Sequence, residues 1–354
     1  MRLGNARPAM LAIAAAMLMS GGLAAAAESA PPVAAHPVLE DRYPVRVTSF
    51  PQGVQGRADL VYSVLPGFRP LRLDLYMPTG KSSSRPLVVF IHGGGWLSGH
   101  TRHSGAFENW PAVLASLAAK GYVVASVEYR LSSEARFPAA IQDIKTAIRW
   151  LRAHATEYGI DKSRTVVWGG SAGGQLAALA GTSCGAPALE PPPVAPQPGG
   201  GQGTVKPEDK ESDCVQGLVT WYGIFDFSTL VTQSGTRGRE VGTAASSPGL
   251  YLGCALSSCP TAVLAAASAA HYVDSKDPPA LLIHGSDDRT VPVQQSRDFY
   301  VLLKSKGVPV ELVEIPGVDH SFIGSTPEAT RAASLLALQK TFGFIGRILG
   351  RAQQ

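Results

Sequence analysis

Six short, mostly apolar segments recur between residues 87 and 313, and most of them show no alternation. Strands have this composition when helices cover both faces of their sheet. Apolar residues at helical spacing separate the segments, as in 138–151, which Pro138 opens. This order predicts an α/β fold with a mostly parallel central sheet, right-handed crossovers and flanking helices. The expected strands are 87–91, 123–127, 165–168, 218–221, 280–283 and 310–313, and further helices are expected at 110–119, 172–181, 292–306 and 327–348.

The folded domain is expected to occupy residues 42–354 and to carry two insertions. Residues 60–65 and 71–77 alternate between apolar and polar, which favours a half-exposed antiparallel edge of the sheet. The insertion at 185–213 is rich in proline, glycine and charge, so it predicts a loop. The small residues of 226–273 suit a short helical cap over the strand ends. With 354 residues and 45% hydrophobic content, the chain can bury the core of one such domain.

The start of the chain has the pattern of a signal peptide over residues 1–27. Arg2 and Arg7 precede an apolar run at 10–19 that is too short to span a bilayer, and small residues suited to signal peptidase follow. Residues 28–41 are rich in proline and alanine and predict a flexible segment. We therefore expect an exported protein, periplasmic or secreted.

The charge of the chain argues against two classes of partner. The formal net charge is +4, and without the two leader arginines it is about +2. There is no basic run, so neither nucleic acid nor a membrane surface is an expected partner, and no later segment predicts stable membrane insertion. The oligomeric state stays open.

All four cysteines lie in the second half of the chain, and an even number in an exported protein suggests disulfide bonds. Three pairings are possible. We favour Cys184–Cys214 and Cys254–Cys259, because each pair then closes one contiguous loop-like segment. No spacing resembles a metal site or a redox motif.

The chemistry is indicated most strongly by the segment Gly169–Gly174, which holds Ser171 in a G-x-S-x-G pattern. The segment follows an expected strand and opens an expected helix, which is the context of a nucleophile elbow. Glycines beside the serine permit a sharp turn and close packing. We therefore expect Ser171 to be a catalytic nucleophile.

A second glycine-rich segment, His92–Trp96, directly follows the strand expected at 87–91. Ester hydrolysis passes through a tetrahedral oxyanion that needs hydrogen-bond donors. The N–H groups of Gly93, Gly94 and Ala172 are the expected oxyanion hole. His92 is expected to shape this loop by hydrogen bonding rather than to act as a base.

A nucleophilic serine needs a base, and the base needs an orienting acid. In the order Ser, acid, His, both partners should follow later strands. Asp287 and Asp288 follow the strand expected at 280–283, and His320 follows the strand expected at 310–313. All three positions lie where the active sites of open α/β sheets are found.

These motifs resemble the α/β-hydrolase superfamily, and within it the hormone-sensitive-lipase-like and feruloyl/acetyl-xylan-esterase-like carboxylesterases. The similarity covers about residues 60–348 and includes Glu128–Leu131 and Phe137–Ala140. The family motif H-G-x-x-D-x-x-V-P matches residues 284–292, and the resemblance therefore implies Asp288 as the acid. Gly170 stands where many lipase-like members have Asp, which favours the xylan- and feruloyl-type branch.

Several other side chains have two interpretations. Trp96, Trp221 and Tyr222 lie near strand ends, where they either wall a substrate pocket or pack in the core. His100 and His103 lack a third ligand, so we expect no metal site. Arg130 and Asp143 are expected to form a buried structural pair.

We expect a serine esterase without a cofactor that acts on a small-molecule ester. The substrate class is small acyl or aryl esters, including acetyl or feruloyl esters of plant cell walls. An amidase or formamidase of the same fold is the alternative among enzymes. The alternative from another class is a catalytically inactive binding module.

Overall fold

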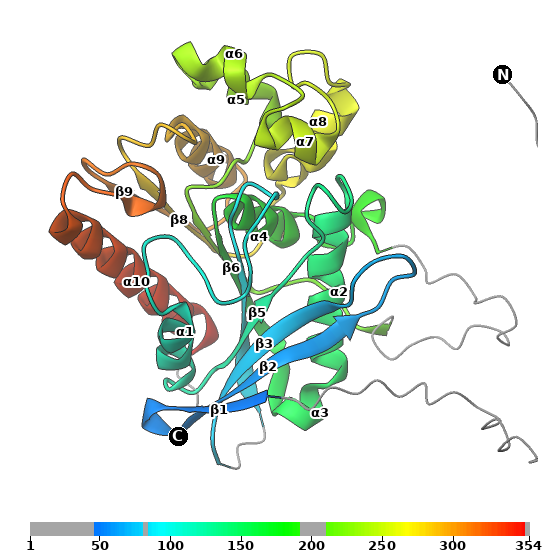
Figure 1. Ribbon diagram of the computed structural model, residues 1–354, viewed down its shortest axis with the longest axis vertical. Coiled ribbons are helices and arrows are strands. Elements are labelled where there is room, and N and C mark those ends of the chain that lie inside the picture. The colour runs from blue at the N-terminus through cyan, green and yellow to red at the C-terminus, as the bar shows by residue number, and fades with distance from the viewer. Residues whose placement is uncertain (1–45, 81–83, 192–209, 351–354) are drawn as a thin grey trace, which may run out of the picture. The chain divides into compact units, whose positions relative to one another are not determined.

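Nine strands form one sheet within residues 46–80, 84–191 and 210–350, which the computed structural model describes (Figure 1). The expected signal peptide and flexible segment lie outside these residues, as does 192–209 of the loop insertion. The strand order is β1-β2-β3-β5-β4-β6-β7-β8-β9. The strands are β1 (Arg46–Phe50), β2 (Val54–Ser63), β3 (Leu71–Pro78), β4 (Arg85–Ile91), β5 (Val123–Val127), β6 (Ile160–Gly170), β7 (Gly217–Trp221), β8 (Ala280–Gly285) and β9 (Val310–Ile315).

The sheet confirms the six expected parallel strands, since β5, β4, β6, β7, β8 and β9 all run parallel. The antiparallel strands β1 to β3 precede them and extend one edge. Three details differ from the expectation: β2 begins before residue 60, β3 is mostly buried rather than half-exposed, and the sequence pattern does not predict β1. Four of the five β1 side chains are exposed, so this strand has no apolar pattern by which it could be recognised.

Helices cover both faces of the sheet (Figure 1). Neighbouring residues of one strand enter opposite cores: Val88 and Phe90 of β4 belong to the core that includes residues of α1 and α10. Leu87 and Val89 belong to the core that includes residues of α2, α4 and α9. This double burial explains the uninterrupted apolar segments. The helices are α1 (Trp110–Ala118), α2 (Ala139–Ala153), α3 (Ala155–Tyr158), α4 (Ala172–Thr182), α9 (Gln294–Ser305) and α10 (Pro327–Leu349). The arrangement is the α/β-hydrolase fold.

The segment between β7 and β8 contains four short α-helices, drawn in yellow-green to yellow in Figure 1. Gln295 of α9 fastens the beginning of this segment, because its side chain accepts from the N–H groups of Phe225 and Asp226 and donates to Gln233. We call residues 226–273 the cap. Its helices are α5 (Phe227–Gln233), α6 (Gly238–Val241), α7 (Ser247–Leu252) and α8 (Thr261–Ala267).

Both expected cysteine pairs are present, Cys184–Cys214 and Cys254–Cys259, with Cα atoms 5.0 and 5.2 Å apart. The Cys184–Cys214 pair joins the two residues that flank the loop insertion at 185–213. Beside it the fully buried ammonium of Lys145 lies 2.8 Å from a carboxylate oxygen of Asp213. A buried charge is tolerated only when it is paired, so this contact holds the end of the insertion against α2.

Arg130 and Asp143 form a second buried ion pair, as expected. The guanidinium of Arg130 donates from Nε and Nη2 to the Asp143 carboxylate, which also accepts from the Arg130 backbone N–H at 2.8 Å. The pair ties the loop after β5 to α2 and has a structural role.

Candidate active site

Ser171 stands in the sharp turn between β6 and α4 with φ 56° and ψ −122°, a conformation that is rare outside glycine. The turn depends on close backbone contacts. A Cβ atom at Gly173 would lie 2.1 Å from the carbonyl oxygen of Ile91, and a Cβ atom at Gly169 would lie 2.2 Å from that of Gly173. The Ser171 N–H donates to the carbonyl of Trp221 at 2.9 Å, which fixes the turn against β7.

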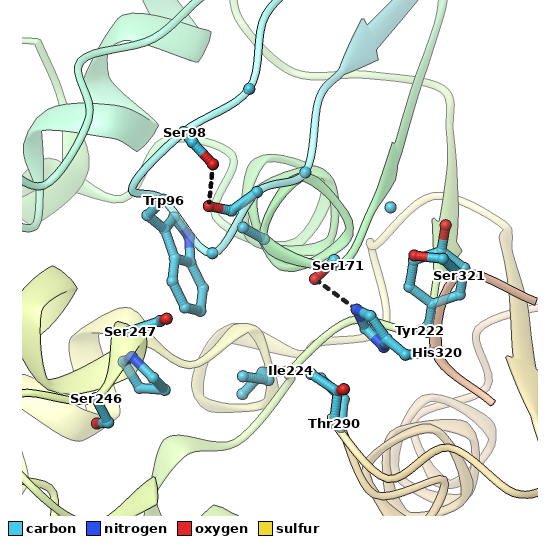
Figure 2. A pocket seen from close by; sticks show the side chains of 18 of the residues that line it. Trp96, Ser98, Ser171, Tyr222, Ile224, Ser246, Ser247, Thr290, His320 and Ser321 are labelled. Atoms are coloured by element: carbon cyan, nitrogen blue, oxygen red, sulfur yellow. Dashed lines mark hydrogen bonds between the residues drawn. The ribbon is translucent and has the colours of Figure 1, made fainter. Parts of the chain in front are cut away.

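His320 lies beside Ser171, with its Nε2 atom 2.9 Å from the serine Oγ (Figure 2). The histidine begins a tight turn after β9, in which Ser321 and Phe322 both have φ near 60°. The Asp319 carboxylate stabilises this turn by accepting from the His320 N–H at 2.7 Å and from the Arg289 N–H at 2.8 Å. These hydrogen bonds go to the backbone rather than to the imidazole, so Asp319 organises the loop.

Asp288 orients the other side of the His320 ring. Its Oδ2 atom lies 2.8 Å from His320 Nδ1, and its side chain is fully buried. Its Oδ1 atom accepts from the backbone N–H groups of Thr290 and Val291, both at 2.8 Å. The exposed neighbour Asp287 accepts instead from the Ser286 hydroxyl at 2.6 Å. The geometry thus joins Ser171, His320 and Asp288 in one hydrogen-bonded chain.

The Asp288 carboxyl is held in its charged form. Burial raises its pKa, but hydrogen bonds from His284 and His320 lower it by more, and the resulting pKa lies well below the ordinary value. An anionic Asp288 can fix the tautomer of His320 and stabilise a positive charge on the ring.

The glycine loop after β4 faces the serine. A Cβ atom at Gly93 would stand 3.4 Å from Ser171 Cβ and 2.8 Å from the Gly170 carbonyl oxygen, so the approach requires glycine. Gly94 has φ 112°, which also favours glycine. Gly93, Gly94 and Ala172 all line the same cavity as Ser171.

His92 shapes this loop. Burial lowers the pKa of its ring to about 4, so the ring is neutral near pH 7, and Nδ1 lies 2.8 Å from the Gly93 carbonyl oxygen. The ring stacks on Tyr129 with centroids 4.4 Å apart. A trans peptide points its N–H opposite to its C=O. By holding the Gly93 carbonyl, His92 fixes the direction of the Gly94 N–H.

The cavity above Ser171 has a volume of about 1130 Å³ and is bounded by both the core and the cap (Figure 2). Trp96 and Tyr222 line it. The Trp96 ring stacks on Tyr251 at 4.4 Å, and its Nε1 donates to Gln175 Oε1 at 3.1 Å. The cap contributes further lining residues that the sequence did not single out, because its helices are too short to show periodicity; they include Leu230, Val241, Ser247 and Pro248.

Of the two interpretations of Trp221, the structure supports core packing, since Trp221 is not among the residues that line the cavity. Its side chain is fully buried, donates from Nε1 to Thr341 Oγ1 at 3.0 Å and packs against Trp168. The reason is the alternation of side chains along β7, which directs Trp221 toward α10. Tyr222 follows the strand with φ 40°, leaves that alternation and reaches the cavity.

His100 and His103 line the cavity with their ring centroids 6.1 Å apart. Among the described residues, no group of three or more metal-ligating side chains is found. Nor does any helix in the described ranges have the length and apolar character needed to cross a membrane.

The fold and the hydrogen bonds that link Ser171, His320 and Asp288 define an α/β hydrolase with a serine-centred site. The chain belongs to the BD-FAE family, whose model matches residues 73–303.

Known proteins similar to this chain are named as esterases or related hydrolases. It is 35% identical to the esterase LipC of Mycobacterium tuberculosis over 247 residues, which are 70% of this chain and 54% of LipC. The chain thus spans about half the length of that relative. It also resembles the propionate-bound structure of the thermophilic esterase Est2 of Thermogutta terrifontis, with 26% identity and a TM-score of 0.62. This similarity covers 88% of this chain and 96% of the Est2 chain. The acetyl ester-xyloside bifunctional hydrolase of Caldicellulosiruptor lactoaceticus is 25% identical, with 82% and 97% covered and a TM-score of 0.61.

The two adjacent aspartates give a matched pair of variants. We expect Asp288→Asn to slow fluorophosphonate labelling of Ser171 by about 10³- to 10⁴-fold, because the amide can favour the wrong imidazole tautomer. Asp287→Asn should label at nearly the rate of the unaltered protein, since the Asp287 carboxylate accepts from the Ser286 hydroxyl rather than from His320. Labelling rates followed by intact-protein mass spectrometry check this, with melting temperatures as the folding control. The reverse ranking would assign the orienting role to Asp287.

Proposed function

We propose that this protein hydrolyses carboxylic esters, with Ser171 as nucleophile, His320 as general base and Asp288 as the orienting acid. The observation that carries the proposal is the continuous hydrogen-bonded chain from Asp288 Oδ2 through His320 to Ser171 Oγ, which ends at the cavity. The esterase names of the relatives support the same activity.

The reaction follows from this geometry. His320 Nε2 takes the hydroxyl proton as Ser171 Oγ attacks the ester carbonyl, and the negative charge moves to the carbonyl oxygen. The N–H groups of Gly93, Gly94 and Ala172 are the proposed donors to that oxyanion. His320 then protonates the leaving alcohol, and an acyl-enzyme remains. Water, deprotonated by His320, releases the acid and restores Ser171.

The proposed substrates are small acyl or aryl esters, including acetyl or feruloyl esters of plant cell walls. Two kinds of observation support this choice. The relatives include a hydrolase named for an acetyl ester. The cavity beside Ser171 is lined by aromatic Trp96 and Tyr222, and hydroxyl side chains such as Ser98 and Ser247 interrupt its apolar lining.

We further propose that the protein is exported, to the periplasm or the medium. The apolar and small-residue pattern of residues 1–27 supports this proposal. The four paired cysteines support it as well, because disulfides persist mainly in oxidising compartments.

The roles of Ser171 and His320 are checked by three variants. We expect Ser171→Ala and His320→Ala each to lower kcat on p-nitrophenyl acetate by about three to six orders of magnitude with folding intact. The double variant should be scarcely worse than either single variant, because the two side chains act as one unit. Additive losses would contradict the shared role, unchanged rates would place the activity elsewhere, and an unaltered protein without any hydrolysis would favour an inactive binding module.

An ester panel checks the substrate class. We expect kcat/KM for the p-nitrophenyl esters of acetate, butyrate and ferulate to exceed that for p-nitrophenyl laurate by at least about tenfold. A fully apolar groove gains about 0.8 kcal/mol for each buried methylene, and the hydroxyl side chains that interrupt the apolar lining here reduce that gain for a long acyl chain. The matching amide, p-nitroacetanilide, is expected to react far more slowly. A preference for the laurate or for the amide would overturn the assignment.

Mass spectrometry of the protein purified from its exporting host checks the location. We expect a mature chain that begins at Glu28 and weighs four hydrogens less than its reduced form, two for each disulfide. A full-length chain in the cytoplasm with four free thiols would contradict export.

A further inference from the structure

A second histidine touches the acid of the proposed site. His284 lies near the end of β8 and is completely buried. Its Nε2 atom is 3.1 Å from Asp288 Oδ2 and 3.0 Å from the carbonyl oxygen of Val291. Its Nδ1 atom is 2.7 Å from the Ser296 hydroxyl on α9. The ring is therefore held on both edges and has one orientation.

The hydrogen on His284 Nε2 can be located from its neighbours. Both groups that face Nε2, the Asp288 carboxylate and the Val291 carbonyl, are acceptors. Nε2 must therefore carry a hydrogen whatever the total charge of the ring. The Ser296 hydroxyl both donates and accepts, so it suits Nδ1 in either state.

The contact matters because two imidazoles share one oxygen. Asp288 Oδ2 accepts from His284 Nε2 and from His320 Nδ1, while Oδ1 accepts from two backbone N–H groups. The hydrogen from His284 fixes the plane of the carboxylate and withdraws charge from the oxygen that faces His320. It can thus change how strongly Asp288 stabilises a positive charge on His320.

We infer that His284 is a positioning residue of the reaction, one that holds Asp288 in place and weakens its pull on the His320 proton. This inference rests on the proposed function, since it assigns His284 a role in the work of the same three residues. A merely structural His284 would fill the core and satisfy its hydrogen bonds without influencing the protonation of His320.

Other charged groups nearby are already paired. Glu314, the β9 partner of His284 in the sheet, binds Arg297 of α9 at 2.6 Å. Asp319, next to His320, accepts from the Arg289 N–H and lies 3.6 Å from its guanidinium. These ion pairs do not include His284, so we expect a change in the pH profile of a His284 variant to report mainly on the contact with Asp288.

The test compares two variants that both lose the bond to Ser296. His284→Gln keeps an N–H donor at about the position of Nε2, whereas His284→Leu has none. We expect His284→Leu to lower kcat about 10- to 100-fold, the size of one hydrogen bond to a charged group, and to leave KM within about twofold. His284→Gln should recover kcat to within about threefold of the unaltered enzyme.

The pH profile of kcat/KM is a second readout. A change in packing alone would not shift its acidic limb to higher pH. Without the donor, Oδ2 keeps more negative charge and stabilises a protonated His320 better. The acidic limb of His284→Leu should therefore move to higher pH, by about half a unit to one unit, and that of His284→Gln should stay near its original position. Ser296→Ala keeps the ring and its donor, and should behave like His284→Gln.

Three results would overturn the inference: equal losses in the Gln and Leu variants, an acidic limb that does not move, or a limb that moves to lower pH. If His284→Leu does not fold, His284→Met replaces it in both measurements, because methionine also lacks an N–H donor and adapts to a buried apolar site. Failure of the proposed function would look different. The unaltered protein itself would then neither hydrolyse p-nitrophenyl acetate nor label at Ser171.

Discussion

The close approach of the β6–α4 turn to the end of β4 is the constraint on which the rest of the site depends. Gly173 packs so near the Ile91 carbonyl, and Gly93 so near the Gly170 carbonyl, that no side chain fits at either position. The same contacts force Ser171 into a strained conformation and bring the glycine loop against it. Because β4 and β6 are neighbouring parallel strands, both turns leave the sheet at one edge. The nucleophile and its proposed oxyanion donors are thus placed by one packing contact between backbones.

The sequence predicts the parts of the fold whose physical signal is local. Strands buried on both faces are apolar throughout, and long helices show periodicity, so these elements match the structure. The elbow is equally clear, because glycines at 169 and 173 on either side of a serine, between a strand and a helix, indicate a turn too tight for side chains. Exposed β1 and the short cap helices carry no such pattern. Their positions depend on partners distant in sequence, such as Gln295, which fastens the start of the cap.

The side chains of the site also differ in whether a local sequence signal predicts their position. Nothing local separates Asp287 from Asp288, and only a family motif favours the second; in the structure the difference is burial beside His320. The orientation of Trp221 could not be read from a run of apolar residues, because such a run does not say which face of the sheet each residue meets. His284 stood within the motif, four residues before Asp288, yet its contact with the carboxylate depends on how the turn after β8 closes.

The motif H-G-x-x-D-x-x-V-P then has a physical basis as a closed set of bonds around one buried carboxylate. His284 donates to Oδ2, the N–H of Val291 donates to Oδ1, and the Val291 carbonyl accepts from His284 in return. At Gly285 a Cβ atom would lie 2.3 Å from the Val318 carbonyl oxygen, so glycine is what lets the loop of His320 come near the acid. A buried carboxylate stays charged only when its oxygens are satisfied in this way. The spacing of the motif therefore suits a charged Asp288 beside His320.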